Sequence, residues 1–207
     1  MAEPKTRADR IDTLFPWLLH WSIADERLAE FRSDAYAVRT PGGWMLIDAL
    51  PLEVALQGEL GEVAGLFLTH GNHQRSAWRL RRELGSPVYV PEGATGLDEE
   101  PDAWIDAGAA LPGGLVAVQA RGFEGACYLT YTHADGTVVL FCGDLICQDP
   151  AGPYRFPVQP NYFDPAGGVE DARRILELSP DVLCAAHAEP IRGSGREVLQ
   201  AAVDGVG

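Results

Sequence analysis

The sequence is poor in positive charge, in cysteine and in long apolar runs. Only 16 of its 207 residues are lysine or arginine, whereas 30 are aspartate or glutamate, so the formal net charge is −14. A surface with that excess of negative charge repels phosphate backbones and anionic lipids, which argues against nucleic-acid and membrane partners. No stretch reaches the roughly 18 apolar residues that a membrane-crossing helix needs.

The first ten residues carry several charges and lack the apolar segment of a secretory signal, so a cytoplasmic location is predicted. The four cysteines lie in or next to apolar runs, where a thiol behaves as a small buried hydrophobic group. They are Cys127, Cys142, Cys147 and Cys184. A chain of this size and expected compartment does not call for a disulfide framework, and none is predicted.

A chain of 207 residues is long enough for one domain with a well-buried core, so a single domain over residues 1–207 is predicted. Strands are expected at residues 35–39, 44–48, 65–69, 87–90, 115–119, 127–132, 137–141 and 181–186. Helices are expected at residues 52–63, 74–84, 168–178 and 195–203. This order indicates a hairpin, a parallel crossover and further strands, hence two sheets flanked by helices. The segment 149–164 is interpreted as an ordered excursion or a lid.

Polar residues recur where apolar runs end. Asp48, His70, Asp144 and His187 each terminate or directly follow a run of four to six apolar residues. Side chains at strand ends meet at one edge of a sheet, where loops hold binding groups on a rigid support. Taken singly, such residues are usually turn caps or hydrogen-bonded structural groups. Taken together, two histidines and two carboxylates have the chemistry of a zinc, iron or manganese site.

Four short motifs in this order resemble the metallo-β-lactamase superfamily. They are Leu46-Ile47-Asp48, Leu68-Thr69-His70, Phe141-Cys142-Gly143-Asp144 and Ala185-Ala186-His187. In that family a leucine-isoleucine-aspartate strand precedes a T-H-x-H-x-D-H motif, and a G-H motif, a glycine-aspartate strand end and a late histidine follow. The resemblance spans the chain from about residue 33 onward. It implies an α/β (α+β) fold, a four-layer αββα sandwich of two mixed β-sheets flanked by helices.

The chain departs from the family pattern in its central motif. Counting from His70 at the first histidine, Asn72 stands at the second histidine, His73 at a variable position, Gln74 at the aspartate and Arg75 at the last histidine. No histidine stands in residues 119–126, where the G-H motif belongs. Neutral amides are weak zinc ligands and arginine is a fixed cation, so the family's two-metal hydrolytic site is not expected to form.

Three alternatives remain open for the site. In the first alternative, one metal ion, Zn, Fe or Mn, is held by His70, Asp144 and His187, with His73 and Glu124 as further candidate ligands. In the second alternative, no metal binds, and Arg75 replaces the charge of the metal by pairing with Asp144. The third alternative, a thiolate site of Cys142, Cys184 and His187, is disfavoured because both thiols are expected in the core. Asp48, Asn72, His73, Gln74, Arg75 and Glu124 are expected to line the pocket.

Two functions follow, from different classes. One is a metal-dependent hydrolase with a single ion, and the other is a metal-free descendant of the fold that binds a small molecule or a protein. The substrate cannot be read from the sequence, because one fold serves many chemistries. A homo-oligomer is compatible with the sequence and is not required by it. His20 and His133 lie outside any ligand-like pattern.

Overall fold

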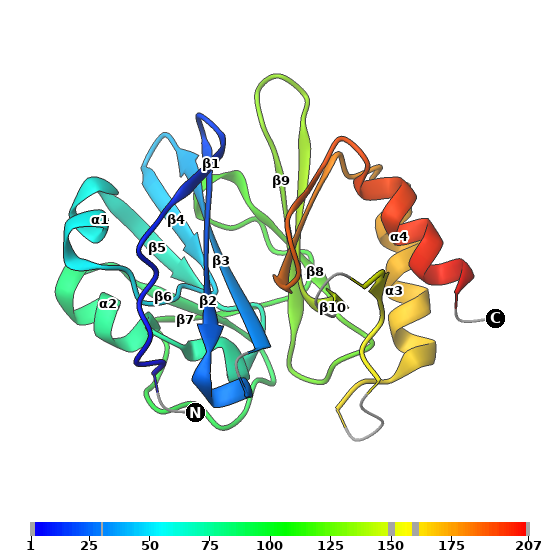
Figure 1. The fold of residues 1–207 in the computed structure, drawn as a ribbon, viewed down its shortest axis with the longest axis horizontal. Coiled ribbons are helices and arrows are strands. Elements are labelled where there is room, and N and C mark those ends of the chain that lie inside the picture. Colours follow the sequence, from blue (N-terminus) through cyan, green and yellow to red (C-terminus); the bar gives the residue numbers. More distant parts are fainter. Residues whose placement is uncertain (1–2, 30, 149–151, 159–161, 206–207) are drawn as a thin grey trace. The chain divides into compact units, whose positions relative to one another are not determined.

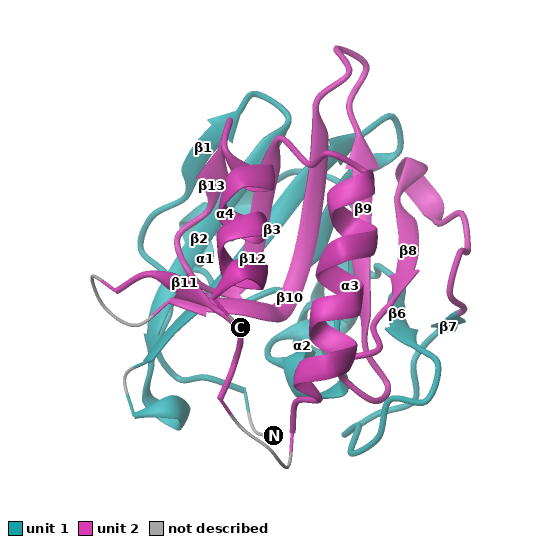
Figure 2. Cartoon of the chain, turned by 90° about the vertical axis from the view of Figure 1, so that its right-hand side faces the viewer, with its two compact units in different colours: residues 1–105 teal, residues 106–207 magenta. Residues whose placement is uncertain are grey.

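The structure is a computed structural model that describes residues 3–29, 31–148, 152–158 and 162–205. The chain divides into two compact units, residues 1–105 and residues 106–207, each with its own sheet (Figure 2). The single-domain interpretation stays a prediction. Within the described residues, no helix combines the length and the apolar character that crossing a membrane requires.

The first unit is built on a seven-stranded mixed sheet, in the order β1-β2-β3-β4-β5-β6-β7 (Figure 1). Its strands are β1 (Asp12–Phe15), β2 (Leu18–Asp25), β3 (Phe31–Thr40), β4 (Gly43–Ile47), β5 (Val63–Phe67), β6 (Val88–Pro91) and β7 (Ala103–Ile105). Neighbours from β1 to β4 are antiparallel, and those from β4 to β7 are parallel. The predicted hairpin and the predicted parallel crossover are both present.

Helices α1 (Val54–Glu59) and α2 (Ala77–Leu84) belong to this unit. In β4, Trp44 and Leu46 join the same core cluster as Ala77, Trp78 and Leu80 of α2. Because side chains alternate along a strand, Met45 lies on the opposite face of the sheet. Both faces of β4 are buried, because every one of its residues is buried. This explains why the sequence of β4 is an uninterrupted apolar run.

Helix α2 begins three residues later than the sequence predicts. The predicted helix started at Gln74, but Gly71–Gln74 form a separate 3-10 turn, η2. Arg75 follows this turn with φ 39° and ψ −110°, a conformation that no α-helix contains. The helix can start only after Arg75. The position of the Arg75 side chain is therefore set by a sharp turn and not by a helix face.

Strand β2 lies before residue 35, where the first strand was expected, and was not predicted from the sequence. The strand contains the buried polar residues His20 and Asp25. Asp25 has a local and a more distant partner: the nearby Arg27 donates through its backbone N and its guanidinium, and Ser33 of β3 donates its hydroxyl at 2.9 Å. Buried polar groups that are paired in this way give a buried strand the polar sequence pattern that is typical of a loop.

Asp25→Asn is expected to reduce the free energy of unfolding by about 2 kcal/mol at pH 7. Burial alone would raise the pKa of Asp25, but the hydrogen bonds from Arg27 and Ser33 and the charge of Arg27 lower it to about 2. A carboxylate with a depressed pKa stabilises the fold above its unfolded value near 4 and loses this contribution as the pH falls toward 2. Urea unfolding at several pH values measures the effect.

The difference between wild type and Asp25→Asn should therefore shrink by about half between pH 7 and pH 3. The exposed Asp9→Asn removes the same charge and serves as the control, with little change at either pH. A difference that stays constant across this range would contradict the assigned pKa.

The second unit is built on a six-stranded mixed sheet, ordered β13-β12-β10-β9-β8 with β11 paired to β10. Its strands are β8 (Val116–Gln119), β9 (Cys127–Thr132), β10 (Val138–Gln148), β11 (Tyr154–Arg155), β12 (Val182–His187) and β13 (Ile191–Arg192). Helices α3 (Pro165–Glu177) and α4 (Gly195–Asp204) lie beside each other on this sheet (Figure 2). Leu140 and Leu183 of the strands share one core cluster with Ile175 of α3 and Leu199 of α4.

Strand β10 continues beyond the point where the sequence analysis ended it. Asp144 was expected to follow the strand but lies within it, because pairing resumes at Cys147 with β11 and β12. The register with β12 shifts on both sides of Gly143, which has φ 50°. A residue with positive φ inside a strand produces a bulge, and a bulge redirects the next side chain. Asp144 directly follows Gly143, so its side chain is the one that the bulge redirects.

Candidate metal site

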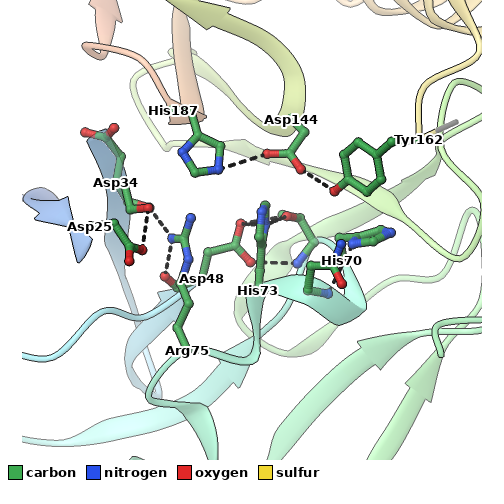
Figure 3. A network of polar contacts seen from close by, with 12 residues as sticks. Asp25, Asp34, Asp48, His70, His73, Arg75, Asp144, Tyr162 and His187 are labelled. Carbon is green, nitrogen blue, oxygen red and sulfur yellow. Dashed lines mark hydrogen bonds and ion pairs between the residues drawn. The ribbon is translucent and has the colours of Figure 1, made fainter. Parts of the chain in front are cut away.

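In the first unit, Asp48 directly follows β4 and is buried. Its carboxylate accepts hydrogen bonds from the Thr69 backbone N at 2.8 Å and from the Thr69 hydroxyl at 2.6 Å. His73 Nδ1 lies 2.9 Å from Asp48 Oδ2 (Figure 3). Burial alone would raise the pKa of Asp48, but the charges of His73 and Arg75 and the hydrogen bonds lower it. Asp48 is thus a buried carboxylate held in its ionised form.

The two histidines of the central motif lie at opposite ends of η2. His70 caps this turn, and its Nδ1 accepts a hydrogen bond from the Asn72 backbone N at 3.1 Å. His73, in contrast, is buried and directs its Nδ1 toward both Asp48 and the Thr69 hydroxyl. Asn72 itself is exposed. The histidine at the variable position of the family motif is therefore the one held by a carboxylate.

Gln74 acts as a brace between two segments. Its amide nitrogen donates to the Gly96 carbonyl at 2.9 Å. Its amide oxygen accepts from Trp78 Nε1 and from the Asp98 backbone N, both at 2.7 Å. The side chain is buried, and its amide oxygen accepts two hydrogen bonds. Gln74, which aligns with the aspartate of the family motif, therefore has a structural role.

Arg75 is buried and bonded to the backbone of two neighbouring strands. Its guanidinium donates to the Asp34 carbonyl of β3 at 2.6 Å and to the Asp48 carbonyl after β4 at 2.8 Å (Figure 3). A cation fixed there lowers the pKa of Asp48. The predicted pairing of Arg75 with Asp144 stays a prediction.

His20 forms a buried polar group that the sequence analysis did not assign to any pattern. Its Nε2 lies 2.7 Å from Asp34 Oδ1, and Arg32 donates to the same carboxylate. In the register of β2 and β3, His20 pairs with Tyr36 and Asp34 pairs with Ser22, so His20 and Asp34 are diagonal neighbours. The signal that the sequence offered for this pair was a polar residue within or beside an apolar run of each strand.

In the second unit, Asp144 and His187 come together from adjacent strands. His187 Nε2 lies 3.4 Å from Asp144 Oδ1, and the Tyr162 hydroxyl donates to Asp144 Oδ2 at 2.6 Å (Figure 3). His187 ends β12, as predicted, and pairs in register with Cys147 of β10. Two residues that the family resemblance singled out are therefore neighbours in this unit.

Tyr162 was not predicted as a site residue. It lies in the segment 149–164, of which residues 149–151 and 159–161 fall outside the described residues. Its ring packs edge-on against Phe123, with 5.2 Å between the ring centroids. The lid interpretation stays a prediction, but the described part of this segment places a hydroxyl on Asp144.

Two other candidates have less support. Glu124 is exposed on the loop between β8 and β9. For the thiolate alternative, Cys184 lies three residues before His187 on β12, so the two side chains point to opposite faces of the sheet. Cys142 and Cys184 are both buried, as the sequence analysis expected.

No family model matches this chain, and no curated protein matches it. Solved structures do match. The DIM-1 metallo-β-lactamase exposed to ceftazidime has a TM-score of 0.75 at 13% identity, with 100% of each chain covered. A metallo-β-lactamase from Pontibacter korlensis has a TM-score of 0.72 at 16% identity, over 94% of this chain and 98% of that one.

A metallo-β-lactamase from Cronobacter sakazakii (Enterobacter sakazakii), described by its HARLDQ motif, has a TM-score of 0.54 at 18% identity. The match covers 86% of this chain and 80% of that one. Identities this low show the fold and nothing finer. The chain has the metallo-β-lactamase fold, as the resemblance implied, and its described residues form two mixed sheets and four α-helices.

Proposed function

We propose that this protein binds one divalent transition-metal ion, through Asp144, His187 and a histidine of the segment 70–73, and that it is a metal-dependent hydrolase. The carrying observation is the spacing of Asp144 and His187 in the second unit. The contribution of the segment 70–73 rests on the order of the motifs in the sequence and on matched structures that cover the whole chain.

The separation of the two donor atoms fits a metal better than a direct hydrogen bond. An N–H···O hydrogen bond usually spans about 2.7–3.2 Å between its heavy atoms, whereas His187 Nε2 and Asp144 Oδ1 are 3.4 Å apart. Two ligands at about 2.1 Å from a tetrahedral zinc ion lie about 3.4 Å from each other. Imidazole nitrogen and carboxylate oxygen are also the donor types that Zn, Fe and Mn accept.

The surroundings of Asp144 support the same proposal. The Tyr162 hydroxyl bonds the other carboxylate oxygen and so fixes the orientation of Oδ1. The bulge at Gly143 turns Asp144 out of the regular strand pattern. When bound, such an ion supplies Lewis-acid chemistry that polarises a substrate carbonyl or activates water. Asp144 and His187 would hold the ion, and Tyr162 would position Asp144.

A second ion of the usual family kind is not part of the proposal. Gln74 and Arg75 stand at two of its ligand positions, and both are occupied by structural hydrogen bonds. The HARLDQ motif of the Cronobacter protein, like residues 70–75 of this chain, begins with histidine and has a residue other than histidine at its third position.

Metal analysis tests the proposal on the full-length protein, purified without added metal and then reconstituted with zinc, iron(II) or manganese. We expect about one equivalent of one of these ions. His187→Ala should weaken its affinity by at least about 100-fold, since it removes a ligand and not only an outer partner. His133→Ala, in the hairpin turn between β9 and β10, is the matched control and should leave the affinity unchanged.

Absence of metal after reconstitution, or an affinity that is equal in wild type and His187→Ala, would overturn the proposal. The remaining candidate would then be a metal-free binding protein. One observation favours that candidate: Arg75 already places a buried cation beside Asp48. Hydrolysis assays on the metal-loaded protein, with lactam, thioester and phosphodiester substrates, distinguish a hydrolase from a protein that binds metal without turnover.

A further inference from the structure

The two histidines of the segment 70–73 differ in the ring nitrogen that carries the hydrogen when the ring is neutral. We infer that His73, at a position where the family motif is variable, supplies the imidazole ligand, with Asp48 as its positioning residue, and that His70 is a structural cap. This inference rests on the proposed function and names the ligand of that same site. It is argued from the hydrogen bonds that each ring makes within the first unit.

The tautomer of His73 follows from its partners. Nδ1 lies 2.9 Å from the Asp48 carboxylate and 3.0 Å from the Thr69 hydroxyl oxygen. The Thr69 hydroxyl donates its own proton to Asp48, at 2.6 Å, so it receives a proton from His73 and does not give one. Nδ1 therefore carries the hydrogen, and in the neutral ring the lone pair is on Nε2. Metal-bound histidines commonly use this arrangement, with the other nitrogen donating to a carboxylate.

His70 has the opposite tautomer. Its Nδ1 accepts the backbone N–H of Asn72 at 3.1 Å, so the neutral ring carries its hydrogen on Nε2. That nitrogen is a donor and cannot bind a metal until it loses the proton or the ring turns over. Turning the ring would leave the Asn72 N–H without its cap at the start of η2. Metal binding through His70 therefore costs the hydrogen bond that caps η2.

His73 is also more deeply buried than His70. The residue is buried, and its carboxylate partner is itself anchored by the Thr69 backbone N. The triad of Asp48, Thr69 and His73 thus fixes the ring from one side before any ion arrives. Less side-chain entropy is lost when a metal binds to a ring that is already held. The sequence expectation that His70 is the ligand is replaced by this proposal.

The test compares zinc affinities of full-length variants by competition with a chromogenic chelator. His73→Ala should weaken zinc binding by at least about 100-fold, while His70→Ala should stay within about threefold of wild type. Asp48→Asn, which keeps the shape and an acceptor oxygen, should weaken it by about 10- to 100-fold, as outer partners of ligating histidines do. Equal affinity of His73→Ala and wild type, with loss in His70→Ala, would overturn the inference.

A measurement on wild-type protein keeps the inference testable if His73→Ala does not fold. Nitrogen-15 NMR of the histidine rings should show hydrogen on Nδ1 of His73 and on Nε2 of His70 before zinc is added. Zinc should then shift Nε2 of His73 and leave His70 unchanged, and the reverse pattern would overturn the inference. If His187→Ala abolishes zinc binding and His73→Ala does not, the inference fails while the proposed function stands. If wild type binds no zinc, both fail.

Discussion

Asp48→Ala is expected to lower the free energy of unfolding by about 3–5 kcal/mol, as the removal of one partner from a buried charged network does. The variant loses the acceptor of the Thr69 backbone N, of the Thr69 hydroxyl and of His73. It also leaves the buried Arg75 with less compensating charge. Urea unfolding followed by tryptophan fluorescence measures the loss, because Trp21, Trp44 and Trp78 lie in the core of the same unit.

The effect of Asp48→Ala should also depend on pH. The pKa of Asp48 is lowered in the folded protein, so its contribution is present above the unfolded value, about 4, and is lost as the pH falls below it. The difference between wild type and variant should therefore narrow in acid. Glu59→Ala removes an exposed carboxylate from α1 and should change stability by less than about 0.5 kcal/mol. A loss in Asp48→Ala as small as in this control would show that the network is not a stabilising one.

Asp171→Ala should have an effect of similar size, about 3–5 kcal/mol, in the second unit. One oxygen of this fully buried carboxylate accepts from the backbone N of Arg121 at 2.6 Å, from that of Gly122 at 2.9 Å and from the Tyr128 hydroxyl at 2.9 Å. The other oxygen accepts from Arg174 at 2.8 Å. Alanine would leave these donors buried without an acceptor.

The consequence of Asp171→Ala reaches the loop between β8 and β9. Gly122 packs so closely on α3 that a Cβ there would meet Gly168 at 3.0 Å, and Asp171 holds the backbone in that position. Hydrogen exchange should therefore rise in residues 119–126 as well as stability fall. Glu177→Ala, an exposed change on the same helix, is the control for charge and helix propensity. Unchanged hydrogen exchange in residues 119–126 would show that Asp171 does not hold the backbone of this loop in place.

Three residues at ligand positions of the family motif have different fates in this chain. Asn72 is exposed, Gln74 joins η2 to the loop at 96–98, and Arg75 ties β3 to the end of β4. The side chains of Gln74 and Arg75 are thus engaged in hydrogen bonds that connect segments of the first unit.

Several elements could be predicted because their signals are local. The hairpin of β3 and β4 follows from two apolar runs around Pro41-Gly42-Gly43, and the parallel pair β5 and β6 follows from strand–helix–strand spacing. Strand β2 could not be predicted in the same way. Its buried polar residues pair with Asp34 and Ser33 of β3, and that pairing exists only once the two strands have come together.

The sequence by itself determined the order of the strands and helices that it predicted, and three of the polar residues that end or interrupt strands: Asp48, Asp144 and His187. An apolar run that stops at a polar residue is a local pattern, and it needs no knowledge of distant contacts. The tertiary structure decided what these and the neighbouring residues do. Which nitrogen of His70 or His73 carries hydrogen depends on whether a backbone N–H or a carboxylate faces the ring, and the carboxylate facing His73 belongs to a residue 25 positions earlier in the chain.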